Sequence, residues 1–186
     1  MSGAVVYTIG HSTHTSEEFI ALLRAHSIQT VADVRTVPRS RRVPQFNKES
    51  VAGKLGAAGI GYIHMKELGG WRHARKDSPN TGWRNASFRG YADYMLSAKF
   101  ELAISALIEL ARSTNVAIMC AEAMPWRCHR WLISDALVVR GIEVRHIVAG
   151  SAADSHKLTE FAEVTGDTIT YPVRAPSSGQ PALDGL

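Results

Sequence analysis

Residues 5–34, VVYTIGHSTHTSEEFIALLRAHSIQTVADV, decide the fold class. The uncharged, β-branched run at 5–9 ends at a glycine and predicts a buried strand. A capping box, formed by Thr15 and Glu18, predicts a helix start, and 30–34 predicts a second buried strand. Strand, helix and strand within about thirty residues make a βαβ unit, so these two strands are expected to run parallel.

The rest of the chain continues this alternation of apolar runs and amphipathic segments. The further expected helices are 48–58, 99–112 and 126–140, and the further expected strands are 61–64, 116–120 and 143–148. The sequence therefore predicts an α/β fold in three layers, with a mostly parallel sheet of about five strands and helices on both faces.

Length and composition indicate one globular unit. The chain has 186 residues, of which 45% are hydrophobic and 20% charged, and these values exclude a fibrous or wholly disordered protein. We expect a single α/β domain over 1–173, a long basic loop region at about 65–90, and a flexible C-terminal tail at 174–186. The sequence has no run of ~20 apolar residues and no secretory pattern, so we expect a cytoplasmic protein without a membrane partner. Its two cysteines should then be reduced.

Positive charge is concentrated in the middle of the chain. Residues 34–89 contain twelve Lys or Arg and three Asp or Glu, a net charge of +9, whereas the remainder carries −5. This division suggests an anionic small molecule or a nucleic acid as partner, although a solvated loop face would have the same composition. Trp71 and Trp83, in the polar loop, could stack on bases. The sequence has no helix-turn-helix, zinc-finger or RNP pattern, so nucleic-acid binding is the second interpretation.

Reactive side chains follow several of the expected strands. Carboxyl ends of parallel strands meet at one edge of a sheet, where α/β proteins bind their ligands. The residues expected at this edge are His11, Ser12, Asp33, Arg35, His64, Gly69, Gly70, Cys120 and Glu122, with His146 near the end of the fifth strand. Asp33 and Arg35 share a face of an extended segment, and could pair with each other, orient a histidine or hold a ligand.

The segment 120–130 carries the densest group of reactive residues. We expect Cys128 in the first turn of the helix predicted at 126–140, where the helix dipole and the neighbouring Arg127, His129 and Arg130 favour a thiolate. Cys120, at the end of an apolar strand, is expected to stay protonated. Adjacent side chains diverge by about 100° around a helix, so we expect the histidine partner of Cys128 to be His11 or His64.

Three chemistries remain open for these residues. The first is nucleophilic catalysis, with catalytic candidates Cys128, His11, Glu122, His129 and Asp33. The second is a metal site formed by Cys120, Cys128 and His129, although the spacing of the two cysteines is not that of a zinc knuckle. The third is an anion site, with substrate-binding candidates Arg35, Arg130, Ser12, Gly69, Gly70 and Trp71. The sequence indicates no particular cofactor and no oligomeric state.

These motifs resemble a bacterial and archaeal family catalogued as domain of unknown function 488. The resemblance covers most of 5–148 and implies an α/β fold with a polar site, but no reaction. The motifs that carry it are 8–12 (TIGHS), 33–35 (DVR) with Pro38 and Ser40, Tyr62 with 68–70 (LGG), and Cys120-x-Glu122 with 128–130 (CHR).

A weaker similarity is to rhodanese-like domains, which also end a strand in Asp-x-Arg and carry a cysteine loop before a helix. In this sequence Glu122 follows Cys120, and Arg127 lies seven positions after it. This difference argues against sulfur transfer or phosphatase chemistry by Cys120.

Overall fold

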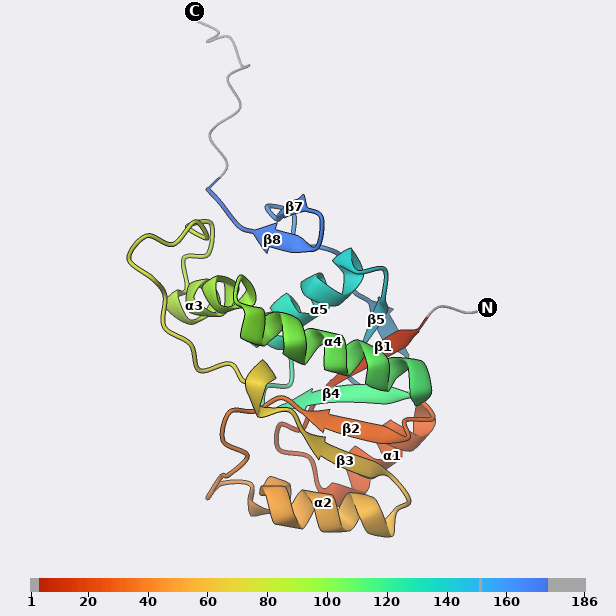
Figure 1. Cartoon of the computed structure of the whole chain (residues 1–186). Coiled ribbons are helices and arrows are strands. Elements are labelled where there is room, and N and C mark those ends of the chain that lie inside the picture. The colour runs from red at the N-terminus through yellow and green to blue at the C-terminus, as the bar shows by residue number, and fades with distance from the viewer. Residues whose placement is uncertain (1–3, 151, 174–186) are drawn as a thin grey trace, which may run out of the picture.

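The fold is built on a six-stranded sheet in the order β3-β2-β4-β1-β5-β6 (Figure 1). The computed structural model describes residues 4–150 and 152–173. The strands are β1 (Val5–Gly10), β2 (Thr30–Asp33), β3 (Gly61–His64), β4 (Val116–Cys120), β5 (Glu143–Ile147) and β6 (Ala153–Ser155). The first five run parallel and β6 is antiparallel to β5. The predicted α/β class is confirmed, and β6 is an additional strand that the sequence did not predict.

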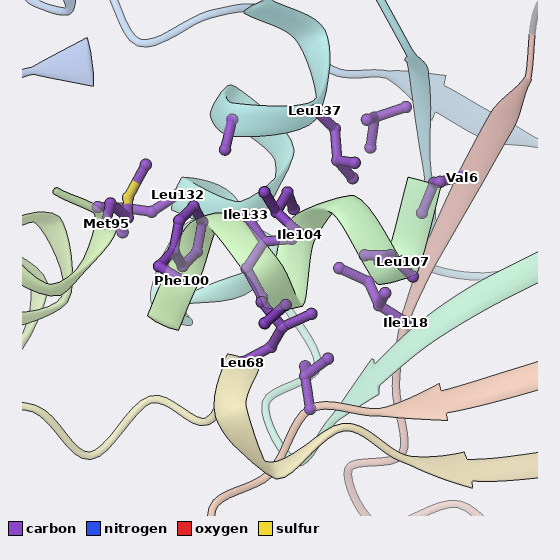
Figure 2. Close-up of a cluster of buried hydrophobic side chains, with 14 of the residues drawn as sticks. Val6, Leu68, Met95, Phe100, Ile104, Leu107, Ile118, Leu132, Ile133 and Leu137 are labelled. Atoms are coloured by element: carbon purple, nitrogen blue, oxygen red, sulfur yellow. The ribbon is translucent and has the colours of Figure 1, made fainter. Parts of the chain in front are cut away.

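Helices cover both faces of this sheet (Figure 1). The helices are α1 (Ser16–Ala25), α2 (Lys48–Ala57), α3 (Ala86–Met95), α4 (Ala98–Ser113) and α5 (Arg130–Val139). Side chains alternate along β4, so Ala117 and Met119 face α1 and α2 whereas Ile118 faces the other three helices. Figure 2 shows the hydrophobic core on the face covered by α3, α4 and α5, where side chains of α4 and α5 pack against Val6 and Ile118 of the sheet.

Helices with clear local sequence signals begin and end close to their predicted positions. Thr15 caps α1 with its Oγ1 accepting from the Glu18 N–H, and the Glu18 carboxylate accepts from the Thr15 N–H. α2 and α4 also begin and end within a residue or so of their expected positions. A capping box satisfies two unpaired backbone donors at once, so it fixes a helix start reliably.

The helix predicted at 126–140 begins later than expected. Pro125–Arg127 forms a separate 3-10 turn, η3, and the N–H of Cys128 donates to the carbonyl of Pro125. Cys128 is then extended, with φ −139° and ψ 152°, and His129 is the N-cap of α5. The expectation that Cys128 lies in the first helical turn is therefore wrong.

Hydrogen bonds hold the long basic loop against α3. It begins with a 3-10 turn, η2 (Lys66–Leu68), and the hydroxyl of Tyr91 donates to the Leu68 carbonyl. Further along, the carboxylate of Asp93 accepts from the Arg75 N–H and from the side chain of Asn80. Contacts with one helix thus hold a segment that has little secondary structure of its own.

The remaining features lie toward the C-terminal end. Two short strands, β7 (Glu163–Thr165) and β8 (Thr168–Thr170), form a separate hairpin that the sequence did not predict. The tail predicted at 174–186 lies outside the described residues. Within 4–150 and 152–173, no helix combines the length and the apolar character that a membrane span requires.

The helices that follow β1 and β2 lie on one face of the sheet, and the helix that follows β4 lies on the other face. The chain passes from β1 into α1 and from β2 into α2, on one face, whereas from β4 it passes to α5 on the other face. Since β4 lies between β1 and β2, a crevice is expected at the carboxyl ends of these three strands.

Candidate functional site

A cavity of about 520 Å³ lies at the carboxyl ends of β1, β2 and β4. Its wall comes from the loops that follow these strands, from 70–71, and from the start of α3. Eight of the residues expected at the site line this cavity: His11, Arg35, Gly70, Trp71, Cys120, Glu122, Cys128 and His129. Segments more than a hundred positions apart in the sequence therefore converge on one wall.

Two cysteines and a histidine form a cluster in this wall, which we call the Cys–His cluster (Cys120, Cys128 and His129). The Nδ1 atom of His129 lies 3.5 Å from the Sγ of Cys128 and 3.9 Å from the Sγ of Cys120. All three ligand atoms lie within 4.8 Å of one another, and both cysteines are buried and free. The cluster thus gathers two sulfurs around a single imidazole nitrogen.

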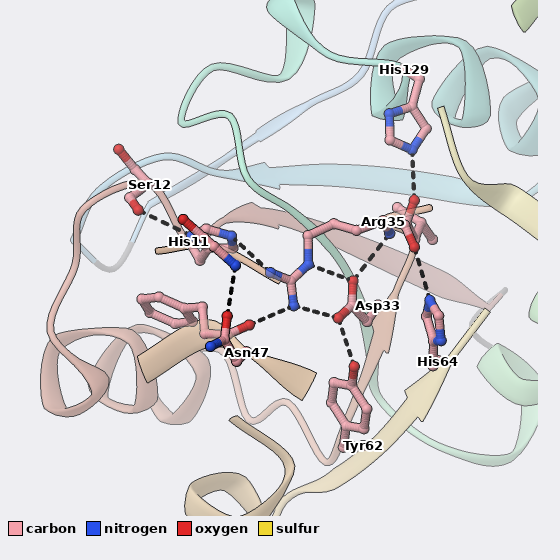
Figure 3. Close-up of polar contacts among 11 residues, drawn as sticks. His11, Ser12, Asp33, Arg35, Asn47, Tyr62, His64 and His129 are labelled. Carbon is pink, nitrogen blue, oxygen red and sulfur yellow. Dashed lines mark hydrogen bonds and ion pairs between the residues drawn. The ribbon is translucent and has the colours of Figure 1, made fainter. Parts of the chain in front are cut away.

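The tautomer of His129 follows from its other contact. The Nε2 atom lies 2.9 Å from the carbonyl oxygen of Val34, which can only accept a hydrogen bond (Figure 3). Nε2 therefore carries the proton, and the Nδ1 lone pair faces the sulfurs of Cys120 and Cys128. The imidazole is positioned to accept a thiol proton or to bind a metal.

Cys128 lies outside the helix, so the divergence of about 100° between neighbouring helical side chains does not apply to Cys128 and His129. Both residues line the same cavity. The expectation that His11 or His64 partners this cysteine is wrong. His11 contacts Arg35, and His64 Nε2 contacts the Arg35 carbonyl.

The two thiols differ in acidity. A hydrogen bond from Cys120, assisted by the nearby His129 and Arg130, lowers the pKa of Cys128 well below its usual range despite burial. The same hydrogen bond, together with burial, raises the pKa of the Cys120 thiol well above its usual range. Cys128 is therefore the thiolate of the pair, as the sequence predicts, but Cys120 is its main support.

Asp33 and Arg35 form a buried ion pair behind the cavity (Figure 3). The Asp33 carboxylate accepts from Arg35 Nε at 2.9 Å and from Nη2 at 2.6 Å, and also from the Tyr62 hydroxyl at 2.7 Å. Nη2 also donates to the carbonyl of Phe46, and Nη1 contacts His11 Nε2. Of the five N–H groups of a guanidinium, one on Nη1 is left over, and it can serve a ligand in the cavity.

His11 is held neutral beside this ion pair. Its Nδ1 donates to the Ser12 carbonyl at 3.0 Å, its Nε2 accepts from Arg35 at 3.2 Å, and its ring stacks on Phe46. Burial, together with the positive charge of Arg35, lowers the pKa of His11 to about 4. His11 thus orients Arg35 and adds no positive charge of its own at neutral pH.

Arg130 lies behind the cavity wall and not on it. The side chain is fully buried, and its guanidinium donates to the carbonyl of Glu122 and to the hydroxyl of Thr8. Its Nε has no hydrogen-bond partner, and within the described residues no carboxylate forms an ion pair with it. Arg130 therefore acts on the site through its charge, since a ligand in the cavity cannot touch it.

Five other expected residues have different positions. Gly70 packs over the ring of His129, and a Cβ atom there would lie 2.5 Å from Nδ1. Gly69 and Ser12 lie outside the cavity lining. Trp71 lines the cavity and is 77% exposed. Trp83 packs against the aromatic side chains of the core, so its expected role in base stacking is wrong.

Several site residues were missed at the level of sequence. Arg39, Ser87 and Phe88 line the cavity, whereas Arg127, which also lines it, was already expected beside Cys128. Both arginines are exposed. In the sequence Arg39 is one of several basic residues, and no local pattern distinguishes it from its neighbours. The Val34 carbonyl, which fixes the His129 tautomer, is a backbone group and leaves no sequence signal.

Comparison with known families agrees with the resemblance seen in the motifs. The family model described as Domain of unknown function DUF488 matches residues 15–137. The chain belongs to this family. No curated protein and no solved structure gave a match. Membership of DUF488 names no reaction, so the geometry of the cavity is the basis for any functional conclusion.

Proposed function

We propose that this DUF488 protein is an enzyme that binds a phosphorylated or otherwise anionic substrate in the cavity, next to Cys128. One observation carries the proposal: Cys128 lies 3.5 Å from His129 Nδ1, in the wall of a cavity that three arginines also line. A stabilised thiolate and an oriented imidazole are the groups that acyl and phosphoryl transfer use. The two free cysteines suit a reducing compartment, and we assign the activity to the cytoplasm.

The arginines supply the anion-binding part. Arg35 offers one unused N–H from a guanidinium that Asp33 holds rigidly, and the exposed Arg39 and Arg127 add positive charge at the rim. Rigid, pre-oriented guanidinium groups bind phosphate or carboxylate with little loss of side-chain entropy. Arg72 contributes less, because it donates to backbone carbonyls and stacks on the ring of Tyr94.

The thiolate of Cys128 can act in two ways. As a nucleophile it would attack an electrophilic carbon or phosphorus of the substrate, while His129 takes the thiol proton and returns it to the leaving group. As a metal ligand it would need the other members of the Cys–His cluster as well. Both uses require the same deprotonated sulfur beside a bound anion.

Binding of inorganic phosphate tests the anion site. At constant ionic strength, phosphate should raise the thermal unfolding temperature of the full chain in a saturable way. Arg39→Ala and Arg127→Ala should each weaken this effect several-fold. Arg112→Ala is the matched control, because Arg112 lies at the amino ends of the strands and outside this cavity, so it should leave phosphate binding unchanged.

Hydrolysis of p-nitrophenyl phosphate esters tests the catalytic part. Turnover should be lost in Cys128→Ser and in His129→Gln and retained in Arg112→Ala. A chain that neither gains stability from phosphate nor hydrolyses any ester of this kind would contradict the proposal.

A nucleic acid or nucleotide is the second candidate ligand, and the exposure of Trp71 favours it. The indole is 77% exposed at the wall of a cavity that Arg39 also lines. Exposed aromatic rings near arginines bind single-stranded nucleic acid by stacking. Quenching of tryptophan fluorescence by a short single-stranded oligonucleotide should weaken steeply with salt and disappear in Trp71→Ala. Quenching that is independent of salt would argue against this candidate.

A further inference from the structure

We infer that the Cys–His cluster is a Zn²⁺ site with three protein ligands and one open coordination position facing the cavity. The ligands are the Sγ atoms of Cys120 and Cys128 and the Nδ1 atom of His129. This inference goes beyond the proposed function, which needs an anion and a thiolate but no metal.

Both sulfurs lie from Nδ1 at about the separation that a tetrahedral zinc site requires. With Zn–S bonds of about 2.3 Å and Zn–N bonds of about 2.0–2.1 Å, neighbouring ligand atoms lie roughly 3.5–3.8 Å apart. The observed separations from Nδ1 are 3.5 Å to Cys128 and 3.9 Å to Cys120. A catalytic thiol with a histidine base needs only one sulfur near the imidazole, whereas a metal uses both sulfurs together with Nδ1 as ligands.

The histidine is prepared for coordination by its surroundings. Nε2 donates to the Val34 carbonyl, which leaves the Nδ1 lone pair directed at the sulfurs. Metal-binding histidines are oriented in this way by a second hydrogen bond. The distances from a Gly70 Cβ to Nδ1, Cγ and Cε1 would be 2.5, 2.7 and 3.0 Å, so this glycine lies over the ring face and confines it.

The choice of metal follows from the ligand type. Two thiolates and an imidazole form a soft donor set, which favours Zn²⁺ over Mg²⁺ or Ca²⁺. The two thiolates would neutralise the charge of the ion. No carboxylate or further histidine joins the cluster within the described residues, so the set is three ligands and not the closed four of a structural site.

The open position gives the metal a chemical use. All three ligands line the cavity, so the fourth position faces the space between the cluster and Arg35. Zinc there would act as a Lewis acid toward an oxygen of an anionic substrate or would make a bound water more acidic. Glu122, exposed on the same wall, lies on the substrate side of the cluster.

Metal content of the full chain, purified without an affinity tag, tests the inference. We expect about one zinc per chain. After a chelator has removed the zinc, added Co²⁺ should produce thiolate-to-cobalt charge-transfer absorption. Cys120→Ser, Cys128→Ser and His129→Gln should each weaken Zn²⁺ binding at least tenfold, with folding checked by circular dichroism. His73→Gln is the control, because this histidine is exposed and outside the cavity.

Two results would overturn the inference. One is a folded chain that contains less than a tenth of an equivalent of zinc and shows no charge-transfer band with Co²⁺. The other is zinc binding that Cys120→Ser leaves unchanged. In either case phosphate binding and a reactive Cys128 would survive if the proposed function is correct, so the failure of one proposal is distinguishable from the failure of the other.

Discussion

Gly70→Ala is the sharpest single test of how the Cys–His cluster is held. The added Cβ would lie 2.5 Å from His129 Nδ1, whereas ordinary contacts of such an atom begin at 3.4 Å. The ring must therefore move by about 0.9 Å, the difference between these distances, if the backbone at 70 stays in place. Gly70 is not among the residues with positive φ, so alanine fits the local backbone and the cost falls on the histidine.

A displacement of this size has a large effect on a metal site. Metal–ligand distances tolerate only about 0.2 Å, and disturbing the support of a ligand typically costs 10–100-fold in affinity. We expect Gly70→Ala to weaken Zn²⁺ binding by at least tenfold, measured by competition with a chromophoric chelator. In metal-free protein the alkylation of Cys128 at pH 7 should also slow several-fold, because the thiolate loses its imidazole neighbour.

Gly56→Ala supplies the matched control. Gly56 lies in α2, and a Cβ there meets nothing within 4 Å. This substitution should leave zinc affinity and alkylation unchanged and should stabilise the fold by about 0.5–1 kcal/mol, because alanine favours the helix. A Gly70→Ala protein that matches the wild type in both zinc affinity and alkylation rate would show that Gly70 does not confine the His129 ring.

The ion pair and the buried histidines give further predictions. Asp33→Ala should lower the unfolding free energy in urea by about 3–5 kcal/mol, because it leaves Arg35 buried and unpaired. Asp77→Ala should cost far less, because Asp77 and its partner Arg75 are both exposed to solvent. Equal losses in the two variants would contradict this. Burial lowers the pKa of His11 to about 4 and that of His146 to about 3, so below pH 6.5 the unfolded chain binds protons that the folded chain does not. Stability is thus fully present above pH 6.5 and should fall by roughly 2 kcal/mol for each histidine between pH 7 and 5. Urea midpoints that stay constant over that range would refute the assignment.

The fold was predictable from sequence because its signals are local. Buried strands such as 116–120 are continuous apolar runs, and the capping box at Thr15 fixes a helix start without any distant contact. β6 and the hairpin at 163–170 were missed because they are three-residue strands without a clear apolar pattern. Short, half-exposed strands depend on the partners beside them, which the sequence does not display.

The candidate site was predictable in part, through the rule that carboxyl ends of parallel strands meet. That rule brought His11, Arg35 and Cys120 together correctly. It could not show that Arg130 is fully buried, because a charged residue next to a cysteine is read as a surface group unless its surroundings are known. The depth of a residue behind the cavity wall depends on tertiary structure. For this reason Arg130, expected to contact the substrate, instead acts on the site through its charge.

The turn at Pro125 decides what the cysteines can do. In a continuous helix the side chains of Cys128 and His129 would diverge by about 100°. The 3-10 turn ends before Cys128, this residue is extended, and its Sγ lies 3.5 Å from the Nδ1 of His129. The reactivity of the site is therefore a property of the conformation of a few residues and not of residue content. That is why the motif alone is compatible with a nucleophile, a metal site and an anion site.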